Sequence, residues 1–361
     1  NRENRPKYLH KGFQNGVLVR MADDKLTEYT DMEYKSMDEN KFLVVKDLRV
    51  EYTSDSDVIK AVNGVSFALE RGKTLGLVGE TGAGKTSIAK AILRILPDPP
   101  AKVRSGQVLF EGRDLMKISE AEMRKIRGRR ISMIFQDPMT ALNPVMKVGE
   151  QIAEVIRLHS DLKKKEAEQQ AVRTLEMVGI NADRFSEYPH QFSGGMKQRV
   201  VIAMALACSP ELLLADEPTT ALDVTIQAQV LEMVNRLKGE NNTAMILITH
   251  DLGVVAEVCD EVAVVYAGEI IEYGKKEDIF LDPRHPYTKG LFAALPTLDT
   301  DSDRLNPIPG TLPDPTRLPE GCKFYDRCSC AQASCAKEGV ELAKIGPGHS
   351  CRCIRVMRGE I

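Results

Sequence analysis

The alternation of hydrophobic and polar residues becomes regular at residue 42, and from there it predicts strands followed by a helix. Residues 42–52 and 65–69 have the alternating, β-branched composition of paired strands. Residues 74–78 form a short apolar run typical of a buried strand, and a glycine-rich turn follows it. A helix that ends before Pro97 is predicted next, because apolar residues recur there at helical spacing: Ile88, Ala89, Ile92, Ile95 and Leu96.

Further along the chain, the pattern predicts a helical region and then two buried strands. Residues 145–180 are expected to be mostly helical, with Gly179 as the stop, because four apolar residues share one helical face: Val148, Ile152, Val155 and Ile156. Residues 212–215 and 244–249 predict buried strands with a helix between them. Strands that alternate with helices form a parallel sheet covered on both faces. The predicted fold class is therefore α/β, with an antiparallel β subdomain from the first paired strands and a helical insertion.

Changes in composition divide the chain into three parts. Residues 1–40 mix both charge signs with few periodic apolar positions, so we expect a loosely ordered extension. Residues 41–282 are the expected main domain, with a helical subdomain over about residues 137–206. Proline and glycine become frequent after residue 282 and a cysteine cluster begins there, so residues 283–361 are predicted to form a smaller second unit.

Charge and hydropathy narrow the possible partners. The chain carries 49 Lys and Arg against 52 Asp and Glu, a net charge of -3, which argues against binding to nucleic acid. A bilayer span needs roughly 20 apolar residues, whereas the apolar run at residues 200–208 is cut by Ser209 and Pro210. We also find no secretory signal at the start of the sequence. The expectation is a cytosolic chain whose membrane role, if it has one, depends on a partner.

Residues 79–86 match the pattern G-x-x-x-x-G-K-[ST], which binds nucleotide phosphates when it stands between a strand and a helix. Glycines allow a tight turn whose backbone N–H groups face the phosphates, and the following helix presents its positive end to the same charge. Lys85 is expected to contact the β- and γ-phosphates, and the hydroxyl of Thr86 to bind Mg²⁺. The residues predicted to bind the nucleotide here are Gly79, Glu80, Thr81, Gly82, Ala83, Gly84, Lys85, Thr86 and Ser87.

Two carboxylates, Asp216 and Glu217, follow the apolar strand at residues 212–215. An aspartate at a strand tip suits Mg²⁺, bound directly or through water, so Asp216 is predicted to serve the metal. Glu217 is predicted to polarise the attacking water as a general base. An acidic pair alone would also suit a solvated turn or a helix cap; the glycine-rich turn upstream favours the catalytic interpretation.

Further motifs follow in the order typical of ABC transporter ATPases, and the chain resembles this family over about residues 42–280. Residues 192–199 resemble the family signature, with Phe192 and Met196 where many members carry Leu and Gln. The other matches are the Q-loop residue Gln136, the D-loop at residues 221–223, the switch histidine His250 and the adenine-stacking aromatic Tyr52. The resemblance implies a P-loop NTPase fold that binds ATP and Mg²⁺.

The resemblance also implies roles for these residues. Ser193, Gly194 and Gly195 would bind the γ-phosphate of ATP held by a second subunit, so that two nucleotides lie between the subunits of a head-to-tail dimer. Gln136 would bind Mg²⁺ and report the nucleotide state to the helical insertion. His250 would hydrogen-bond the γ-phosphate. Gln136, His250 and the general base described above are thus the expected catalytic residues.

Outside these motifs, the chain resembles the oligopeptide and dipeptide importers of the family, at residues 136–144, 188–191, 283–291 and 306–310. The implied function is ATP hydrolysis that energises peptide import from the cytoplasmic face of the membrane. The implied partners are a homologous second ATPase subunit, two integral membrane permease subunits and, indirectly, an extracellular substrate-binding protein. Importers of nickel or glutathione are the closest alternatives. A soluble ABC ATPase of DNA repair or translation is disfavoured, because such chains usually carry two cassettes or long coiled-coil insertions.

Six of the eight cysteines crowd between residues 322 and 353, and in a reducing cytosol such a cluster favours metal over disulfides. The spacing C-x5-C-x6-C-x17-C matches the importer family, whose pattern implies a 4Fe-4S cluster held by Cys322, Cys328, Cys335 and Cys353.

Thiolates would suit zinc as well. The spacing lacks the paired C-x2-C knuckles usual in structural zinc sites, which favours iron; free thiols are the third alternative. Cys330 and Cys351 do not fall on the family's ligand positions, and either could be a spare thiol or a substitute ligand. His349 is expected to be structural.

Overall fold

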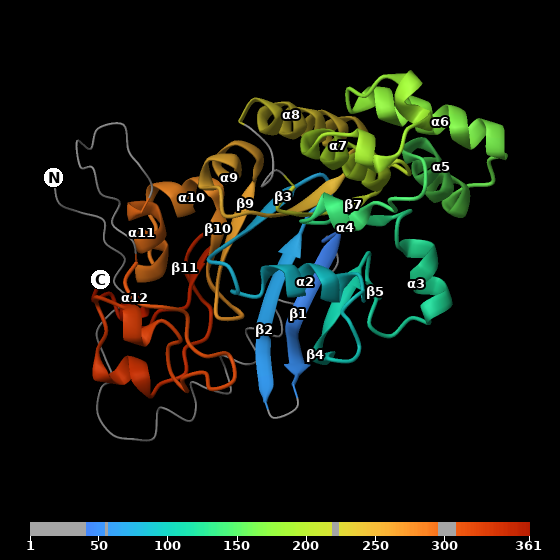
Figure 1. The fold of residues 1–361 in the computed structure, drawn as a ribbon. Helices are drawn as coiled ribbons and strands as arrows, with labels where there is room; N and C mark the ends of the chain where they lie inside the picture. The colour runs from blue at the N-terminus through green and yellow to red at the C-terminus, as the bar shows by residue number, and fades with distance from the viewer. Residues whose placement is uncertain (1–40, 55–56, 219–223, 295–307) are drawn as a thin grey trace. The chain divides into compact units, whose positions relative to one another are not determined.

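The computed structural model describes residues 41–54, 57–218, 224–294 and 308–361 (Figure 1). Within it, Phe42–Ile361 form one compact unit. The extension predicted at residues 1–40 and the D-loop at residues 221–223 lie outside the described residues. The helices are α2 (Lys85–Ile92), α3 (Glu120–Ile126), α4 (Pro138–Ala141), α5 (Val148–His159), α6 (Lys164–Met177), α7 (Gly194–Leu206), α8 (Val224–Asn241), α9 (Leu252–Val258), α10 (Lys276–Leu281), α11 (Pro286–Ala293) and α12 (Ile354–Met357).

A four-stranded antiparallel sheet is built from the first strands, in the order β2-β1-β4-β5. Its members are β1 (Leu43–Thr53), β2 (Val58–Leu69), β4 (Ala101–Phe110) and β5 (Arg113–Asp114). The predicted pairing of the first two strands is confirmed, with a register that runs from Leu43 opposite Leu69 to Thr53 opposite Val58. β2 begins earlier than predicted, because its first half alternates between exposed and half-buried positions and carries a weak hydrophobic signal.

The second sheet has eight strands in the order β11-β12-β10-β9-β3-β8-β7-β6. Its members are β3 (Thr74–Val78), β6 (Ile131–Ile134), β7 (Leu212–Asp216), β8 (Ala244–Ile248), β9 (Glu261–Tyr266), β10 (Glu269–Lys275), β11 (Ala343–Gly346) and β12 (His349–Cys351). The strands from β9 to β6 are parallel, as predicted, and β10, β12 and β11 continue the sheet in antiparallel pairs.

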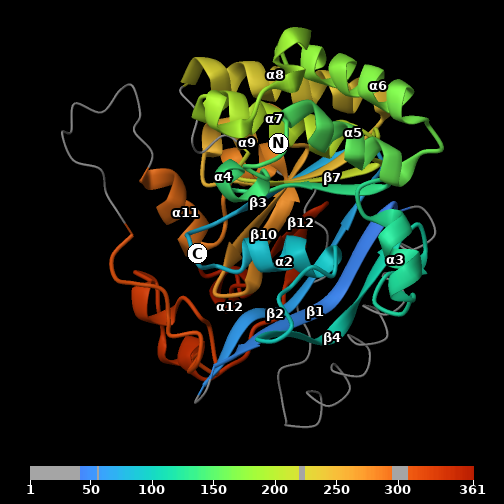
Figure 2. The same ribbon diagram turned by 45° about the vertical axis from the view of Figure 1, so that its right-hand side comes forward.

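Alternate residues of the central strands pack into two cores. In β7, Leu213 and Ala215 pack with the helical region, α8 and α9, whereas Leu212 and Leu214 pack with α2 and the antiparallel sheet. Figures 1 and 2 show α7, α8 and α9 above the parallel strands and α2 with the antiparallel sheet below them. The prediction of a parallel sheet covered on both faces is thus confirmed.

The helical region inserted between β6 and β7 comprises α4 to α7 and two 3₁₀ turns, Ala182–Ser186 and Pro189–Gln191. Gly179 ends α6 as predicted: its φ is 73°, and the N–H groups of Gly179 and Ile180 donate to the carbonyls of Glu176 and Leu175 at 2.9 Å. Such a left-handed residue is the usual way for a helix to end.

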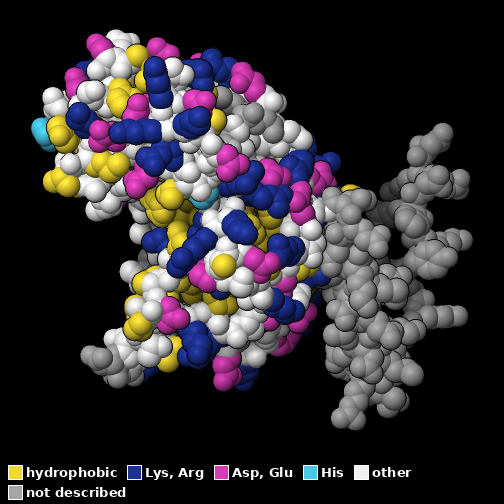
Figure 3. All heavy atoms as spheres, turned by 90° about the vertical axis from the view of Figure 1, so that its right-hand side faces the viewer, with side chains coloured by type: hydrophobic (Ala, Val, Ile, Leu, Met, Phe, Trp, Pro, Cys, Tyr) yellow, Lys and Arg dark blue, Asp and Glu magenta, His cyan; other side chains and the backbone are white. Residues whose placement is uncertain are grey.

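An apolar groove runs between this helical region and the strands below it. Leu93, Phe135, Val155 and Met204 are among its lining residues, and Phe135 is 40% exposed. Figure 3 shows hydrophobic side chains gathered in the hollow between the helical lobe and the rest of this face. A hydrophobic hollow of this kind on a protein surface often marks a contact with another chain.

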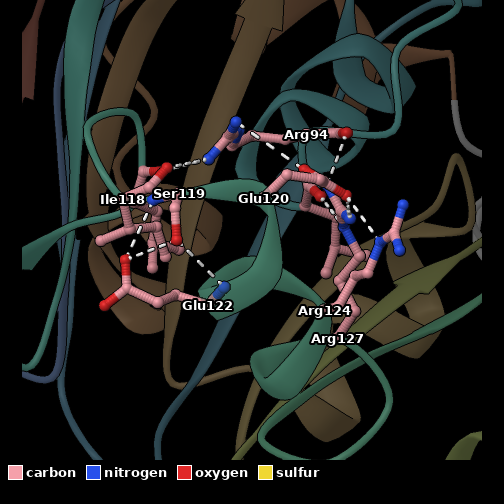
Figure 4. A network of polar contacts seen from close by, with 9 residues as sticks. Arg94, Ile118, Ser119, Glu120, Glu122, Arg124 and Arg127 are labelled. Carbon is pink, nitrogen blue, oxygen red and sulfur yellow. Dashed lines mark hydrogen bonds and ion pairs between the residues drawn. The ribbon is translucent and has the colours of Figure 1, made fainter.

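The floor of the groove is held by polar contacts between the end of α2 and α3 (Figure 4). Arg127, which also lines the groove, donates to the carbonyls of Leu93 at 2.7 Å and Arg94 at 2.9 Å, and pairs with Glu120 at 2.5 Å. Ser119 and Glu122 form the capping box that starts α3. Contacts at the C-terminal end of α2 therefore tie the groove to the helix that begins at the glycine-rich turn.

The prediction that α2 extends to Leu96 is wrong, because the helix ends at Ile92. Arg94 adopts a left-handed conformation with φ 52°, which no helix continues. Ile95 and Leu96 are partly buried and pack against the same core from outside the helix. Their apolar character reflects burial alone, and the periodicity that included them was coincidental.

The C-terminal part contributes two strands, β11 and β12, to the eight-stranded sheet. β12 pairs with β10, so that Glu272 lies opposite Cys351 across the boundary predicted at residue 282. Glu272 is fully buried; it accepts hydrogen bonds from the N–H groups of Arg284 at 2.6 Å and His285 at 2.9 Å, and contacts His349 Nε2 at 2.8 Å. His349 on β12 thus contacts a buried carboxylate on the neighbouring strand, β10. The division of the chain into two domains at residue 282 stays a prediction.

None of the described helices combines the length and the apolar character that a membrane span requires.

We predict that Glu272→Ala lowers the free energy of unfolding by about 3 kcal/mol at pH 7, because it breaks a buried pair. Burial raises the pKa of Glu272, but the hydrogen bonds from His349 and the two N–H groups outweigh it and hold the pKa below its usual range. The stabilisation is therefore present at neutral pH and lost as the pH falls below roughly 4.

Urea unfolding followed by circular dichroism measures this difference. Glu338→Ala is the matched control, because Glu338 pairs with Arg358 on the surface, where both side chains are about half exposed, and the loss should be below about 1 kcal/mol. Equal losses in the two variants would contradict the prediction.

Candidate nucleotide site

The glycine-rich turn joins β3 to α2 and has a backbone that only glycine accommodates. Gly79, Gly82 and Gly84 have φ values of 150°, 86° and 101°. A Cβ on Gly79 would lie 2.1 Å from the carbonyl oxygen of Val265, and one on Gly84 would lie 2.3 Å from that of Ala61. The turn is therefore packed directly against neighbouring backbone, which fixes where its N–H groups point.

The first turn of α2 has the features of an anion site. Its N-cap is Gly84, which has no side chain to cap the first N–H groups, and no acidic residue lies in that turn. Lys85 is buried, and its ammonium donates to the carbonyls of Gly79 at 2.6 Å and Glu80 at 2.9 Å. Burial lowers the pKa of Lys85, although the carboxylates of Glu217, Asp216 and Glu80 act in the opposite direction. The positive charge of Lys85 and the first N–H groups of α2 thus meet where phosphates are expected.

The two residues predicted to serve Mg²⁺ are in contact. The Thr86 hydroxyl donates to the carboxylate of Asp216 at 3.0 Å, from opposite elements, α2 and β7. Asp216 is 2% exposed, and burial raises its pKa more than the hydrogen bond from Thr86 lowers it. A hydroxyl and a carboxylate side by side are the hard oxygen ligands that Mg²⁺ prefers.

Two of the three predicted catalytic residues, Gln136 and His250, contact the carboxylate of the third, Glu217. The amide of Gln136 donates to Glu217 at 3.1 Å, and Nδ1 of His250 lies 3.4 Å from its other oxygen. The side chain of Glu217 is 12% exposed, whereas that of His250 is 61% exposed. Glu217 has φ 48°, a left-handed conformation that a residue with a side chain rarely adopts, and its N–H donates to Ile248 at 2.8 Å. Backbone strain of this kind concentrates at functional sites.

The predicted signature residues begin a different helix and face outward. Ser193 is the N-cap of α7, and its hydroxyl accepts from the N–H of Met196 at 3.3 Å. Ser193 and Gly194 are exposed, Gly195 is half-buried, and a Cβ on Gly194 would meet only open space. In the same helix, the Gln198 amide donates to the carbonyl of Pro218 at 2.6 Å, which ties α7 to the residue after Glu217.

Tyr52 lies at the end of β1, close to the nucleotide turn. Its hydroxyl is 3.1 Å from that of Ser87, and its ring packs partly against the core beneath α2. The structure thus brings Tyr52 and the predicted phosphate-binding residues together, while its contact with adenine stays a prediction.

Two residues that touch the nucleotide turn were not predicted. The carboxylate of Glu80 pairs with Arg327, and the N–H of Glu80 donates to the hydroxyl of Tyr287 at 3.0 Å. Tyr287 lies in a stretch that resembles the peptide importers and Arg327 directly precedes Cys328, yet nothing in the local sequence connects either residue to Glu80, more than 200 positions earlier.

The four predicted cluster ligands line one small apolar cavity, together with Cys330. The N–H of Cys322 donates to the carbonyl of Cys335 at 2.8 Å. Burial raises the pKa of Cys322 to about 11, and the neighbouring thiols act in the same direction. Cys351 is buried on β12 and is not among the residues that line the cavity.

Besides His285, whose Nδ1 accepts a hydrogen bond from the N–H of Tyr287, the side chains lining this cavity that commonly bind metals are thiols, which suit soft metals. Within the described residues, however, no group of three or more His, Cys, Asp or Glu side chains has the arrangement of a metal site. The structure therefore gathers the predicted ligands without supporting the 4Fe-4S cluster itself.

Comparison with protein families gives two matches. A model described as ABC transporter matches residues 62–220, and one described as the C-terminal region of oligopeptide/dipeptide transporters matches residues 271–335. The second match covers three of the four predicted ligands, Cys322, Cys328 and Cys335.

Curated relatives match over most of their length. The oligopeptide transport ATP-binding protein OppD of Bacillus subtilis is 51% identical over 312 residues, which cover 86% of this chain and 87% of that protein. The dipeptide transport ATP-binding protein DppD of the same organism is 51% identical over 315 residues, 87% of this chain and 94% of that protein.

Among solved structures, the fold is similar to that of an ATP-binding cassette captured as a dimer after hydrolysis, with ADP and phosphate bound. The TM-score is 0.60 at 25% sequence identity, and the match covers 65% of this chain and 98% of that one.

Proposed function

Because the chain belongs to the family of ATP-binding subunits of oligopeptide and dipeptide ABC transporters, we propose that the site around its glycine turn hydrolyses the ATP that drives peptide import. The observation that carries this proposal is the convergence of Gln136 and His250 on the Glu217 carboxylate, beside the Thr86–Asp216 pair. The alternative cargoes, nickel and glutathione, gain no support from these relatives, whose names refer to oligopeptides and dipeptides.

ATP binding would use the turn and the start of α2. The N–H groups of residues 81–86 would face the β- and γ-phosphates, and Lys85 would leave the carbonyls of Gly79 and Glu80 to contact them. Tyr52 would stack on the adenine ring. Thr86, Asp216 and Gln136 are the residues that would hold Mg²⁺, which supplies positive charge to the phosphates when bound.

Hydrolysis would proceed through Glu217. Its carboxylate would accept a proton from the attacking water as that water adds to the γ-phosphorus and the bond to ADP breaks. Gln136 and His250 each contact one carboxylate oxygen and so fix its orientation. On nucleotide binding, His250 would turn to hydrogen-bond the γ-phosphate, a role its exposure permits.

The exposed signature residues support a shared site. Ser193, Gly194 and Gly195 stand at the start of α7, where Ser193 and Gly194 are exposed and a Cβ on Gly194 would meet open space, which suits the γ-phosphate of ATP bound to another subunit. We infer a head-to-tail dimer with a homologous ATPase subunit, in which each nucleotide contacts both chains.

The apolar groove beside α5 is the surface that we propose for the permease subunits. Membership in a transporter family implies integral membrane partners, and no described helix of this chain spans a membrane. The groove is lined by Phe135, which directly precedes Gln136, so a cytosolic segment of a permease seated there would lie next to the nucleotide site. The subunit would then sit peripherally on the cytoplasmic face, with the extracellular substrate-binding protein reaching it only through the permeases.

For the cysteine cavity we propose a 4Fe-4S cluster held by Cys322, Cys328, Cys335 and Cys353. Support comes from the five thiols that line the cavity and from the match to the C-terminal region of peptide transporters. When bound, such a cluster would join Cys322 and Cys353, at the two ends of residues 322–353, through one iron–sulfur group.

We predict that Glu217→Gln still binds ATP but hydrolyses it at least about 100-fold more slowly, because the general base is lost. ATP affinity and phosphate release are measured on the full-length chain, alone and with its transporter partners. Glu257→Gln, at an exposed position on α9, is the control and should retain the wild-type rate. Hydrolysis by Glu217→Gln at the wild-type rate would refute the assignment of the base.

We predict that Val155→Asp in the groove weakens association with the membrane subunits by roughly 30-fold, the effect of losing about 2 kcal/mol at an interface hot spot. Copurification of the assembled transporter measures it, and ATP binding should be unchanged. Leu158→Asp on the same helix is the control, because Leu158 is 72% exposed and is not among the groove-lining residues. Equal recovery of both variants would exclude the groove as the docking surface.

We predict that anaerobically purified protein contains iron and acid-labile sulfide in equal amounts and absorbs broadly in the visible range. Cys353→Ser should lose both, whereas Cys330→Ser should keep them. If Cys330→Ser loses the iron and sulfide and Cys353→Ser keeps them, Cys330 is the fourth ligand in place of Cys353. Colourless protein with stoichiometric zinc, or with no metal, would refute the iron cluster.

A further inference from the structure

The second residue of the glycine turn is held by an ion pair from the far end of the chain. The two terminal guanidinium nitrogens of Arg327, Nη1 and Nη2, each donate to one carboxylate oxygen of Glu80 at 2.9 Å, in a two-point contact. The side chain of Arg327 is only 6% exposed and that of Glu80 29%, so water screens the pair less than it screens surface pairs.

The backbone of Glu80 is held as well. Its N–H donates to the hydroxyl of Tyr287, a fully buried residue of α11 whose ring packs 4.7 Å from that of Tyr266. Its carbonyl accepts from Lys85. If Lys85 moves to the phosphates, the contacts that remain on Glu80 include those from Arg327 and Tyr287.

Arg327 is part of the cysteine segment, defined here as residues 322–353, and contacts inside and outside this segment hold its side chain. Its Nε donates to the carbonyl of Pro309 at 2.8 Å, and its guanidinium lies 5.7 Å from the ring of Tyr266 and 5.8 Å from that of Phe324. Phe324 and Cys328, the residue after Arg327, both line the cysteine cavity. The contact to the nucleotide turn and the wall of the cavity therefore belong to one short piece of chain.

We propose that Arg327, assisted by Tyr287, is a positioning residue for the nucleotide turn, through which the folded cysteine segment sets the affinity for ATP. This inference rests on the proposed function of the turn. Coupling between two sites is reciprocal, so bound ATP stabilises the cysteine segment to the same extent that the segment favours ATP.

Two physical effects of Arg327 favour ATP binding. Close packing on neighbouring backbone holds the turn at Gly79 and Gly84, whereas a Cβ on Gly82, between them, would meet only a side-chain atom of Leu312. The contacts on Glu80 therefore restrict a part of the turn that packing leaves freer. The Glu80 carboxylate lies in the turn expected to hold the phosphates, and Arg327 neutralises a charge that would otherwise repel them. Loss of Arg327 both frees the turn and leaves that negative charge unpaired.

The test is a double-mutant cycle on ATP affinity, with the full-length chain and isothermal titration. Arg327→Gln should weaken ATP binding by about 10-fold, within the usual range for coupled sites. In the Glu80→Gln background the same substitution should have little effect, because its partner charge is gone. Arg327→Lys should restore part of the affinity. Arg358→Gln, which removes an exposed pair with Glu338, is the control and should leave the affinity unchanged.

Hydrogen–deuterium exchange of residues 322–335 measures the reciprocal effect. ATP should slow exchange there in the wild-type chain and not in Glu80→Gln. This readout also detects any variant whose cysteine segment has unfolded.

The possible outcomes separate this inference from the proposed function. If the wild-type chain binds no ATP, the function itself fails. If it binds ATP but Arg327→Gln weakens binding equally with and without the Glu80 carboxylate, or exchange is unaffected by ATP, the positioning role is refuted and the function stands.

Discussion

The backbone hydrogen bonds between β3, β8 and β7 are the interaction on which the rest of the site depends. The three strands are adjacent and parallel, so their carboxyl ends lie at one edge of the sheet. Asp216 is the last residue of β7, and Gly79 and His250 follow the ends of β3 and β8 within two residues, although the three are far apart in sequence. Parallel strands therefore bring three positions that are distant in the chain into one site, and the strands that carry them are fully buried.

Much of the fold and site could be predicted because it is encoded locally. Five-residue apolar runs, the glycine turn and the order of the motifs identify β3, β7, β8 and the residues after them. The early start of β2 was missed because its first half, which pairs with the nearby end of β1, carries a weak hydrophobic signal. What else could not be predicted depends on distant contacts: the end of α2 at Ile92, the pairing of β12 with β10, and the bond from Arg327 to Glu80. None of these leaves a periodic pattern in the sequence, because each is decided by a partner far away in the chain.

Negative charge is concentrated at the phosphate end of the sheet. Glu80, Asp216 and Glu217 all lie near enough to Lys85 to raise its pKa against the effect of burial. A polyphosphate adds further negative charge to the same place. The site therefore depends on cations of two kinds, the fixed side chains of Lys85 and Arg327 and a divalent ion bound with the nucleotide. The N–H groups of the glycine turn therefore supply only part of the positive charge that offsets the carboxylates and the phosphates.

The contact between Arg327 and Glu80 has a consequence for the newly made chain. The two residues are separated by 247 positions, and ribosomes add residues from the N-terminus at about 5–20 per second. A nascent chain therefore carries the glycine turn for a time on the order of ten seconds or more before Arg327 exists. During that interval the central strands can fold, but the turn lacks its ion pair. Completion of the nucleotide site thus has to wait until Arg327 has been synthesised.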